Sequence, residues 1–549
     1  MSNYKLYSAS LLSGILLILI FPGFNFEIFA WVSLVPLFIA TRKTSPLASL
    51  KLGFIAGFVF YIGVIYWVVI AMTKYGGIPM AIGIAVLILL SGYLAIYISL
   101  WTFLISVVSR QLSGISYVLA PFLWVTLELI RAHFLTGFPW GSLGYSQFKT
   151  LPVIQIADVT GIYGVSFIIV MVNAAIALFI ESITPLHPPL NKGGSGGVRQ
   201  FATRYMLATA ILLISFLIYG FWRMNIFENP PISPFNKGGL RGIKVALIQG
   251  NIEQDMKWDE KYQNEVFDAH VNLTMQASLD KPDLIVWPES ATPFYFQTDR
   301  NFRSKMIELA QKEGSFILFG TPGYEITDGK NVPYNRAYLL SPHGDVAGKY
   351  DKIHLVPFGE YVPLRKILFF IDKMVVGIGD FQSGEEYTIF KVQSSKFKAQ
   401  SSFGTLICFE VIFPDLVRRF VKNGAEFLVN ITNDGWYGKT AASSQHIAMV
   451  AFRAVENRVP VVRAANTGIS GIIEPTGNIK KETDIFVRTH ISGEINIATP
   501  LHPPLTRGRY WGGKTFYTQY GDVFAYLSVA VTLLLFFLSK GLMMKYKFI

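Results

Sequence analysis

Long apolar runs are the feature that most constrains this chain. Eight segments approach the roughly 20 apolar residues that a helix needs to cross a bilayer. They lie near residues 7–22, 26–41, 51–72, 79–109, 113–131, 160–182, 204–223 and 522–540. Charged residues make up only 15% of the chain, whereas soluble domains average about 25%. The sequence therefore predicts an integral membrane protein with about eight spans, of which the first two are short enough to form a tight hairpin.

Lysine and arginine are distributed unevenly between the short loops that join these segments. With the N-terminus in the cytoplasm, the cytoplasmic loops and tail hold eleven: Lys5, Arg42, Lys43, Lys51, Arg110, Lys192, Arg199, Arg204, Lys540, Lys545 and Lys547. The opposite loops hold three: Lys74, Arg131 and Lys149. Because positive charge concentrates in cytoplasmic loops, both termini are expected in the cytoplasm. This bias explains much of the net charge of +12, so no nucleic-acid partner is inferred.

The region before the last span changes character and is expected outside the cytoplasm. We predict a transmembrane bundle of seven spans over 1–223, an extracytoplasmic α/β domain over 224–521, and a last helix with a cytoplasmic tail over 522–549. Hydrophobic patterning in the domain predicts strands at 243–249, 283–287, 316–320, 337–340, 405–408 and 427–432, and helices at 260–278, 303–312, 415–423 and 442–457. This alternation indicates helices covering a sheet.

Three Pro/Gly-rich stretches and one apolar run interrupt this pattern. The stretches at 185–194, 230–239 and 500–508 resemble one another and are predicted to be loops, with the character of inserted spacers. The apolar run at 364–378 is too short to span a bilayer. It is therefore interpreted either as part of the core or as a lid that dips into the membrane.

Cys408 is the only cysteine of the chain. It lies between the predicted end of a strand and the predicted start of a helix. There, the positive end of the helix dipole would lower the pKa of the thiol, as expected for a nucleophile. The alternative is a small buried hydrophobic side chain, which is the commoner role of a lone cysteine.

Two further stretches carry ionisable groups in apolar surroundings. Glu289 follows the apolar strand that begins at Leu284, and a partly desolvated carboxylate there can act as a general base. Lys352 lies in a stretch with Glu360, where an ammonium could stabilise an oxyanion. A solvated loop Glu and a surface turn with snorkelling lysines are the simpler alternatives.

These three stretches resemble the Glu, Lys and Cys boxes of the nitrilase superfamily. They read LIVWPES at 284–290, KYDKIHLVPFGEYVP at 349–363 and GTLICFEVIFPD at 404–415. The resemblance implies an α-β-β-α sandwich and acyl transfer through a cysteine thioester. It assigns Glu289 as base, Lys352 as oxyanion stabiliser and Cys408 as nucleophile, with Glu360 and Glu410 as supporting acidic residues.

A narrower resemblance covers nearly the whole chain except the Pro/Gly-rich stretches. The outer-loop stretch GFPWGSLGYSQ at 137–147, NDGWYG at 433–438 and the eight-span layout resemble the apolipoprotein N-acyltransferase family. The resemblance implies four substrate-contacting aromatic residues: Trp258, Trp436, Trp140 and Tyr145. An interfacial aromatic belt is the alternative for Trp140 and Tyr145. Phe409 departs from the family pattern, which often has Tyr after the nucleophile.

The family resemblance also implies the substrates and the location. A phospholipid, with phosphatidylethanolamine expected, would donate an acyl chain to Cys408. The acceptor would be the α-amino group of the N-terminal diacylglyceryl-cysteine of an apolipoprotein. The protein would be a multi-pass protein of the inner (cytoplasmic) membrane, with its catalytic domain on the periplasmic side. No cofactor is expected, and no metal, because His354 and His446 lack partners at metal-site spacing.

Two other functions remain alternatives from sequence alone. A membrane-anchored amidase or nitrilase acting on a soluble substrate would need only one helix as an anchor. A transporter or receptor would use the outer domain only for binding. The spans, however, contain few charges, of which Glu128 is the main one, and this is sparse for an ion-coupled carrier.

Overall fold

The computed structural model describes residues 3–42, 44–110, 113–183, 194–228, 241–257, 259–362, 380–394, 400–497 and 514–546. The three Pro/Gly-rich stretches (apart from Gly194), the candidate lid at 364–378 and Trp258 lie outside these ranges. The chain forms two compact units. The first comprises Met1–Val69, Ala81–Glu228 and Asp522–Ile549, and the second comprises Ile70–Met80 and Asn229–Gly521. The short segment Ile70–Met80 therefore groups with the second unit, although it was predicted within the bundle.

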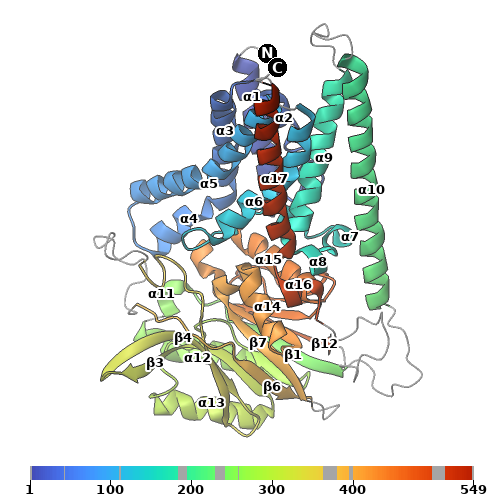
Figure 1. The fold of residues 1–549 in the computed structure, drawn as a ribbon. Coiled ribbons are helices and arrows are strands. Elements are labelled where there is room, and N and C mark those ends of the chain that lie inside the picture. Colours follow the sequence, from blue (N-terminus) through green and yellow to red (C-terminus); the bar gives the residue numbers. More distant parts are fainter. Residues whose placement is uncertain are drawn as a thin grey trace, which may run out of the picture. The chain divides into compact units, whose positions relative to one another are not determined.

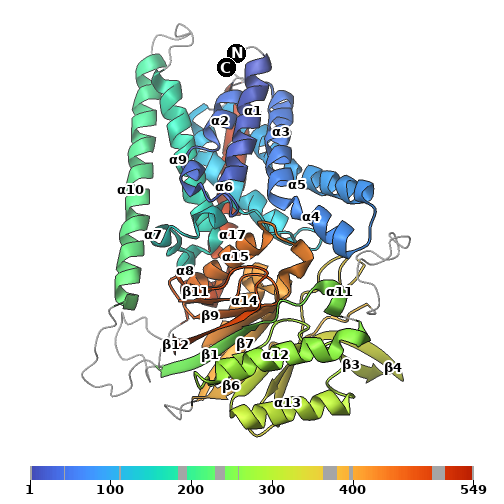
Figure 2. The ribbon, with the colours of Figure 1, turned by 180° about the vertical axis from the view of Figure 1, so that it is seen from behind.

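The first unit is helical (Figures 1 and 2). Its elements are α1 Asn3–Leu19, η1 Glu27–Trp31, α2 Val35–Thr41, α3 Pro46–Ile65, α4 Trp67–Ile70, α5 Met80–Ser109, α6 Ser113–His133, η3 Leu143–Gln147, α7 Leu151–Ile154, α8 Ala157–Thr160, α9 Ile162–Ile183, α10 Gly194–Glu228 and α17 Val523–Tyr546. Helix α1 packs against α3, while α9 packs against α6 and α10. Gly14 of α1 allows close packing, because a Cβ atom there would lie 2.8 Å from the Ala56 carbonyl oxygen of α3.

Five helices within the described residues are long and apolar enough to cross a membrane. They are Pro46–Ile65, Met80–Ser109, Gly114–His133, Ile162–Ile183 and Arg199–Phe227. The other three predicted spans fall on shorter apolar helices, Asn3–Leu19, Glu27–Thr41 and Val523–Leu538. The second of these is divided into a 3₁₀ turn, η1, and a seven-residue helix, α2. The predicted count of eight spans is therefore not confirmed.

The second unit contains two six-stranded sheets. One has the order β12-β1-β2-β3-β4-β5 and the other β11-β10-β9-β8-β7-β6. The strands are β1 Arg241–Gln249, β2 Leu284–Val286, β3 Phe316–Thr327, β4 Lys330–Leu340, β5 Val346–Asp351, β6 Ile389–Gln393, β7 Gln400–Ile407, β8 Phe427–Thr432, β9 Val461–Ala465, β10 Gly471–Ile473, β11 Ile479–Glu482 and β12 Thr489–Ile497. Strands β1, β2 and β3 are parallel, as are β7, β8 and β9.

Helices cover the outer face of each sheet (Figures 1 and 2). The helical elements are η2 Ala71–Tyr75, α11 Gln254–Lys257, η4 Glu260–Tyr262, α12 Gln263–Ser278, α13 Arg300–Glu313, η5 Cys408–Ile412, α14 Pro414–Lys422, η6 Asp434–Tyr437, α15 Ala442–Asn457 and α16 Phe516–Tyr520. Helix α12 packs on β1 and β12, whereas α14 packs on β7 and α15 on β9. The predicted α-β-β-α sandwich is confirmed, and each of the predicted strands and helices in this unit has a counterpart.

Candidate active site

The three candidate catalytic residues each follow the end of a strand in the second unit. Glu289 comes three residues after β2, Lys352 directly follows β5, and Cys408 directly follows β7. The side chains of Glu289 and Lys352 both act electrostatically on the Cys408 thiol. Three stretches far apart in the sequence are thus brought together at one site, each at the carboxyl end of a strand.

Cys408 is held in a conformation that is rare for residues other than glycine. Its φ angle is +54°, a left-handed conformation that costs about 1 to 3 kcal/mol at such sites. The residue is 6% exposed, and the Thr432 side chain hydrogen-bonds to it. Burial, reinforced by Glu289, raises the pKa of the thiol, although Lys352 opposes the rise. The predicted lowering by a helix dipole is therefore wrong: η5 has only five residues and burial dominates, so the resting thiol is neutral and needs a base.

Glu289 is a buried carboxylate with a defined orientation. Its Oε1 accepts a hydrogen bond from Asn335 Nδ2 at 2.9 Å, and its Oε2 accepts one from the Asn433 backbone N–H at 2.9 Å. Lys352 Nζ lies 3.6 Å from Oε1. The carboxylate is thus fixed from two sides near the thiol, which is the placement required of a general base.

Lys352 is a buried ammonium shared by two carboxylates. Its Nζ lies 2.9 Å from Glu360 Oε1, closer than its contact with Glu289, and the residue is only 1% exposed. Glu360 is itself anchored, because its Oε2 accepts the Val356 N–H at 2.8 Å. Burial disfavours the ammonium, but the charges of Glu360 and Glu289 outweigh burial and raise the pKa of Lys352. Lys352 therefore stays protonated and can stabilise negative charge.

Glu410 connects the nucleophile to the segment that carries Lys352. Its Oε2 accepts the Ile407 N–H at 2.7 Å, while its Oε1 accepts the Ile353 N–H at 2.7 Å, the His354 N–H at 3.1 Å and the Tyr350 hydroxyl at 2.8 Å. Burial raises the pKa of Glu410 to about 7, against these donors. Its role as a supporting residue is consistent with this geometry, since its oxygens hold backbone on both sides of the site.

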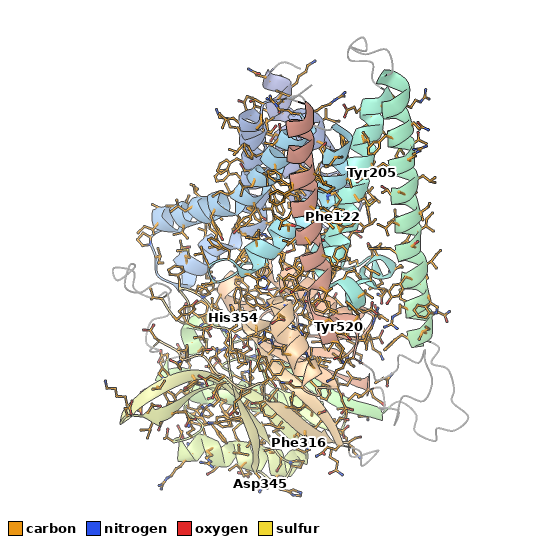
Figure 3. All side chains as sticks on the ribbon, in the orientation of Figure 1. Phe122, Tyr205, Phe316, Asp345, His354 and Tyr520 are labelled. Atoms are coloured by element: carbon orange, nitrogen blue, oxygen red, sulfur yellow. The ribbon has the colours of Figure 1, made fainter. Side chains whose placement is uncertain are left out.

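His354 and Phe409 form an aromatic patch beside this connection. The His354 ring, labelled in Figure 3, lies 3.7 Å from the Phe413 ring and 6.1 Å from the Phe409 ring, measured between centroids. Burial, reinforced by Lys352, lowers the pKa of His354 to about 4, so the ring is neutral near pH 7. Phe409, the residue that departs from the family pattern, is thus packed among rings.

Asn335 is a site residue that the sequence did not single out. It lies on β4 and donates from Nδ2 to Glu289 Oε1 at 2.9 Å and to Glu360 Oε1 at 2.7 Å. Its backbone carbonyl also accepts the Lys352 N–H at 2.9 Å. The side-chain amide of Asn335 thus binds both carboxylates that contact Lys352. The only sequence signal was a polar residue before the apolar end of the strand.

A second buried network, also missed from sequence, lies next to the nucleophile. Arg463 on β9 donates to both carboxylate oxygens of Asp434, at 3.0 and 2.8 Å, and also to Asn430 Oδ1. Asp434 Oδ1 accepts the Thr432 hydroxyl at 3.1 Å and lies 3.2 Å from His446 Nδ1. Because Thr432 also bonds Cys408, this network supports the β8 end of the site.

In the helix predicted at 442–457, the pattern of Arg453 and Glu456 is typical of a packed helix with one solvated face, but the structure has no such face at these two residues. Helix α15 occupies the predicted range, but Arg453 and Glu456 are fully buried and pair at 3.0 Å. The helix packs against α14, α16 and η5 of the same unit. Opposite charges three residues apart are typical of a solvent-exposed helix face, whereas Arg453 and Glu456 form an ion pair in the interior of the unit.

The structure describes three of the four candidate substrate-binding aromatic residues. Trp258 lies outside the described residues. Trp436, in η6, is half-buried and packs edge-on against Tyr75 of the same unit, with ring centroids 6.0 Å apart. Trp140 and Tyr145 belong to the first unit and are 1% and 2% exposed. Among the described residues, no group of three His, Cys, Asp or Glu side chains could hold a metal ion.

Comparisons with known proteins match both parts of the chain. Residues 13–175 match the family described as apolipoprotein N-acyltransferase N-terminal domain, and residues 244–499 match carbon-nitrogen hydrolase. An apolipoprotein N-acyltransferase of Geobacter metallireducens is 42% identical over 527 residues, covering 95% of this chain and 93% of that protein. One of Pasteurella multocida is 30% identical over 495 residues, covering 89% of each.

Two solved structures are also similar to about half of this chain. An amidase from Nesterenkonia sp. is 19% identical, with a TM-score of 0.35, over 48% of this chain and 94% of the amidase. The C. elegans NitFhit protein is 19% identical, with a TM-score of 0.37, over 47% of this chain and 62% of that protein.

Proposed function

Because the chain belongs to the apolipoprotein N-acyltransferase family, we propose that Cys408, Glu289 and Lys352 catalyse its acyl transfer through a thioester. The family membership makes the protein a membrane enzyme that uses a phospholipid donor and a lipoprotein acceptor. One observation carries the proposed mechanism. The only cysteine of the chain lies within electrostatic reach of a buried carboxylate and a buried ammonium.

In the first half-reaction, Glu289 takes the proton of the Cys408 thiol as the sulfur attacks the acyl ester carbonyl of the phospholipid. The carbonyl π electrons move to oxygen, and the ammonium of Lys352 with backbone N–H groups at the start of η5 stabilises this oxyanion. When the tetrahedral intermediate collapses, the carbon–oxygen bond breaks. Glu289 returns the proton to the departing alkoxide, so a lysophospholipid leaves and a thioester remains.

In the second half-reaction, the α-amino group of the diacylglyceryl-cysteine attacks the thioester carbonyl. Glu289 takes a proton from the amine, the carbon–sulfur bond breaks, and the proton returns to the Cys408 sulfur. The amide product forms with no external base. Glu360 and Glu410 hold Lys352 and the nucleophile in place, and Trp258, Trp436, Trp140 and Tyr145 are proposed to contact substrate.

A specific acyl donor and the limits of the domains are also proposed. Phosphatidylethanolamine is the proposed donor, with the sn-1 chain transferred. The proposed parts remain a seven-span bundle over 1–223, a catalytic domain over 224–521 on the periplasmic side, and a last helix with its tail over 522–549. The charge bias of the short loops supports this orientation, with both termini in the cytoplasm.

Incubating purified protein with acyl-labelled phosphatidylethanolamine tests the mechanism. We expect a protein-bound acyl group that hydroxylamine releases, and none with Cys408→Ala. Phosphatidylglycerol carrying the same chains tests head-group preference. Wild-type protein without an adduct, or a hydroxylamine-sensitive adduct on Cys408→Ala, would refute the thioester mechanism.

Cysteine labelling in intact cells tests the orientation. Cys408→Ala yields a chain without cysteine, into which Asp345→Cys or Lys5→Cys can be introduced at exposed positions, the first labelled in Figure 3. With the outer membrane permeabilised, a membrane-impermeant maleimide should label Asp345→Cys. It should label Lys5→Cys only after the inner membrane is disrupted. The opposite pattern would place the catalytic domain in the cytoplasm.

A further inference from the structure

Lys257 is a second buried ammonium at this site, and the mechanism above does not use it. It ends α11 and is 1% exposed. Its Nζ donates to the backbone carbonyl of Glu289 at 2.9 Å. No carboxylate within the described part of the chain forms an ion pair with it. A buried charge without such a partner is costly, so its position beside the proposed base calls for a physical explanation.

Helix α11 contacts both Glu289 and Asn433, a hydrogen-bond partner of the Glu289 carboxylate. Lys257 binds the main chain of Glu289, and Gln254 Oε1 accepts Asn433 Nδ2 at 2.8 Å. The backbone N–H of Asn433 in turn binds the Glu289 carboxylate. The turn that carries Glu289 is conformationally unusual, because the next residue, Ser290, has a φ angle of +46°. One turn of helix therefore holds both the backbone and the carboxylate of the base.

The charges of the site also require a second cation. Glu289 and Glu360 share one ammonium, that of Lys352. Two carboxylates that share a single cation tend to take up a proton, and a protonated Glu289 cannot act as a base. The charge of Lys257 acts on both Glu289 and Cys408. With Lys257 protonated, two ammonium groups balance two carboxylates.

We propose that Lys257 is a positioning residue that fixes the Glu289 turn and supplies the second positive charge beside the Glu289 carboxylate. This inference rests on the proposed function of Glu289 as the base. It adds a residue from a different element, α11, whose charge is needed before the base can act.

The groups that face Lys257 define the pH range for a test. They are Glu289 and Cys408 from the strand ends and His270 from α12. Burial lowers the pKa of Lys257 to about 8, so it is charged below pH 7.5. Burial also lowers the pKa of His270 to about 4, and it raises the pKa of Cys408. Between pH 5 and 7.5, neither His270 nor the thiol should titrate. Glu410, with a pKa of about 7, does titrate in this range, and Glu289→Gln leaves that titration in place.

Alkylation of Cys408 by iodoacetamide, followed by intact mass, measures the base without any lipid substrate. In wild type, the rate should rise with pH across this range, and Glu289→Gln should abolish the rise. In Lys257→Met, we expect the midpoint of the rise to move up by about one pH unit. The rate at pH 6 should fall about tenfold, with most of the difference recovered by pH 7.5.

Lys257→Arg keeps the charge and should keep the wild-type midpoint, whereas Lys330→Met at the exposed start of β4 should change nothing. A purely structural role would lower the rate equally at every pH without moving the midpoint. That result, or an unchanged Lys257→Met, would overturn the inference. Failure of wild type to form the lipid adduct would instead refute the proposed function, because alkylation reports the base alone.

Discussion

Replacing Glu289 with Gln is expected to slow formation of the Cys408 acyl adduct by about 100- to 10,000-fold, the usual contribution of a positioned general base. The thiol is neutral in the resting site because burial raises its pKa. Without a proton acceptor, the attack must proceed from the thiol itself. The amide oxygen of Gln can still accept the Asn433 N–H, so the variant should keep the local fold. Rapid-quench measurement of adduct formation with labelled phospholipid gives the rate.

Glu360→Gln is the matched control for that experiment. Both substitutions remove one negative charge from beside Lys352. Only Glu289→Gln removes the proposed base. Gln at 360 has one amide oxygen, which can still accept from Lys352, and it loses the bond that the other carboxylate oxygen makes with the Val356 N–H. We expect Glu360→Gln to slow the reaction by no more than about tenfold. Equal losses would show that Glu289 acts through the lysine and not as a base.

The parts of the site that were predicted from sequence are those marked by local pattern. Glu289 and Cys408 each follow an apolar strand, one in each sheet, and functional side chains collect at the carboxyl ends of such strands. Lys352 was marked by a stretch dense in ionisable groups among apolar ones, and the family resemblance added Glu410. By contrast, β5 was missed because its charged and exposed residues lack the alternation of a half-buried strand. Edge strands of this kind are identified by their pairing and not by their composition.

The missed residues depend on contacts between distant segments. Asn335 lies 46 positions from Glu289 and 25 from Glu360, and nothing local distinguishes its amide from that of a turn. Arg463 lies 29 positions from Asp434, on a strand whose apolar neighbours predict no charge inside. The burial of Arg453 with Glu456 shows the same limit, because a pair three residues apart looks alike on a surface and in a core. The burial and the partners of these residues are set by contacts between distant segments, and a single sequence does not reveal which segments meet.

Arg463→Met is expected to destabilise the second unit by about 3 to 5 kcal/mol, the usual cost of leaving one member of a buried ion pair unpaired. Asp434 and Arg463 are both fully buried. Although burial opposes ionisation, Arg463 and then His446 hold the pKa of Asp434 well below its usual value. Without the guanidinium, the carboxylate keeps its desolvation cost and loses its main partner. Thermal unfolding of the detergent-solubilised protein measures the effect.

The pH dependence of Arg463→Met distinguishes this cause from a simple packing defect. In wild type, the depressed pKa of Asp434 contributes stability above pH 3.8 that is lost only as pH falls through the folded pKa. In Arg463→Met, burial should raise the folded pKa above that of the unfolded chain. The native state then binds more protons than the unfolded state, so stability should increase as pH falls from 8 to 5. Asp434→Asn in the same background should remove this pH dependence and recover part of the stability.

Arg418→Met, which breaks the partly exposed pair with Asp415, is the control and should cost about 1 kcal/mol or less of unfolding free energy. A deficit in Arg463→Met that neither pH nor Asp434→Asn changes would mean that the arginine stabilises the site by packing and not by its charge.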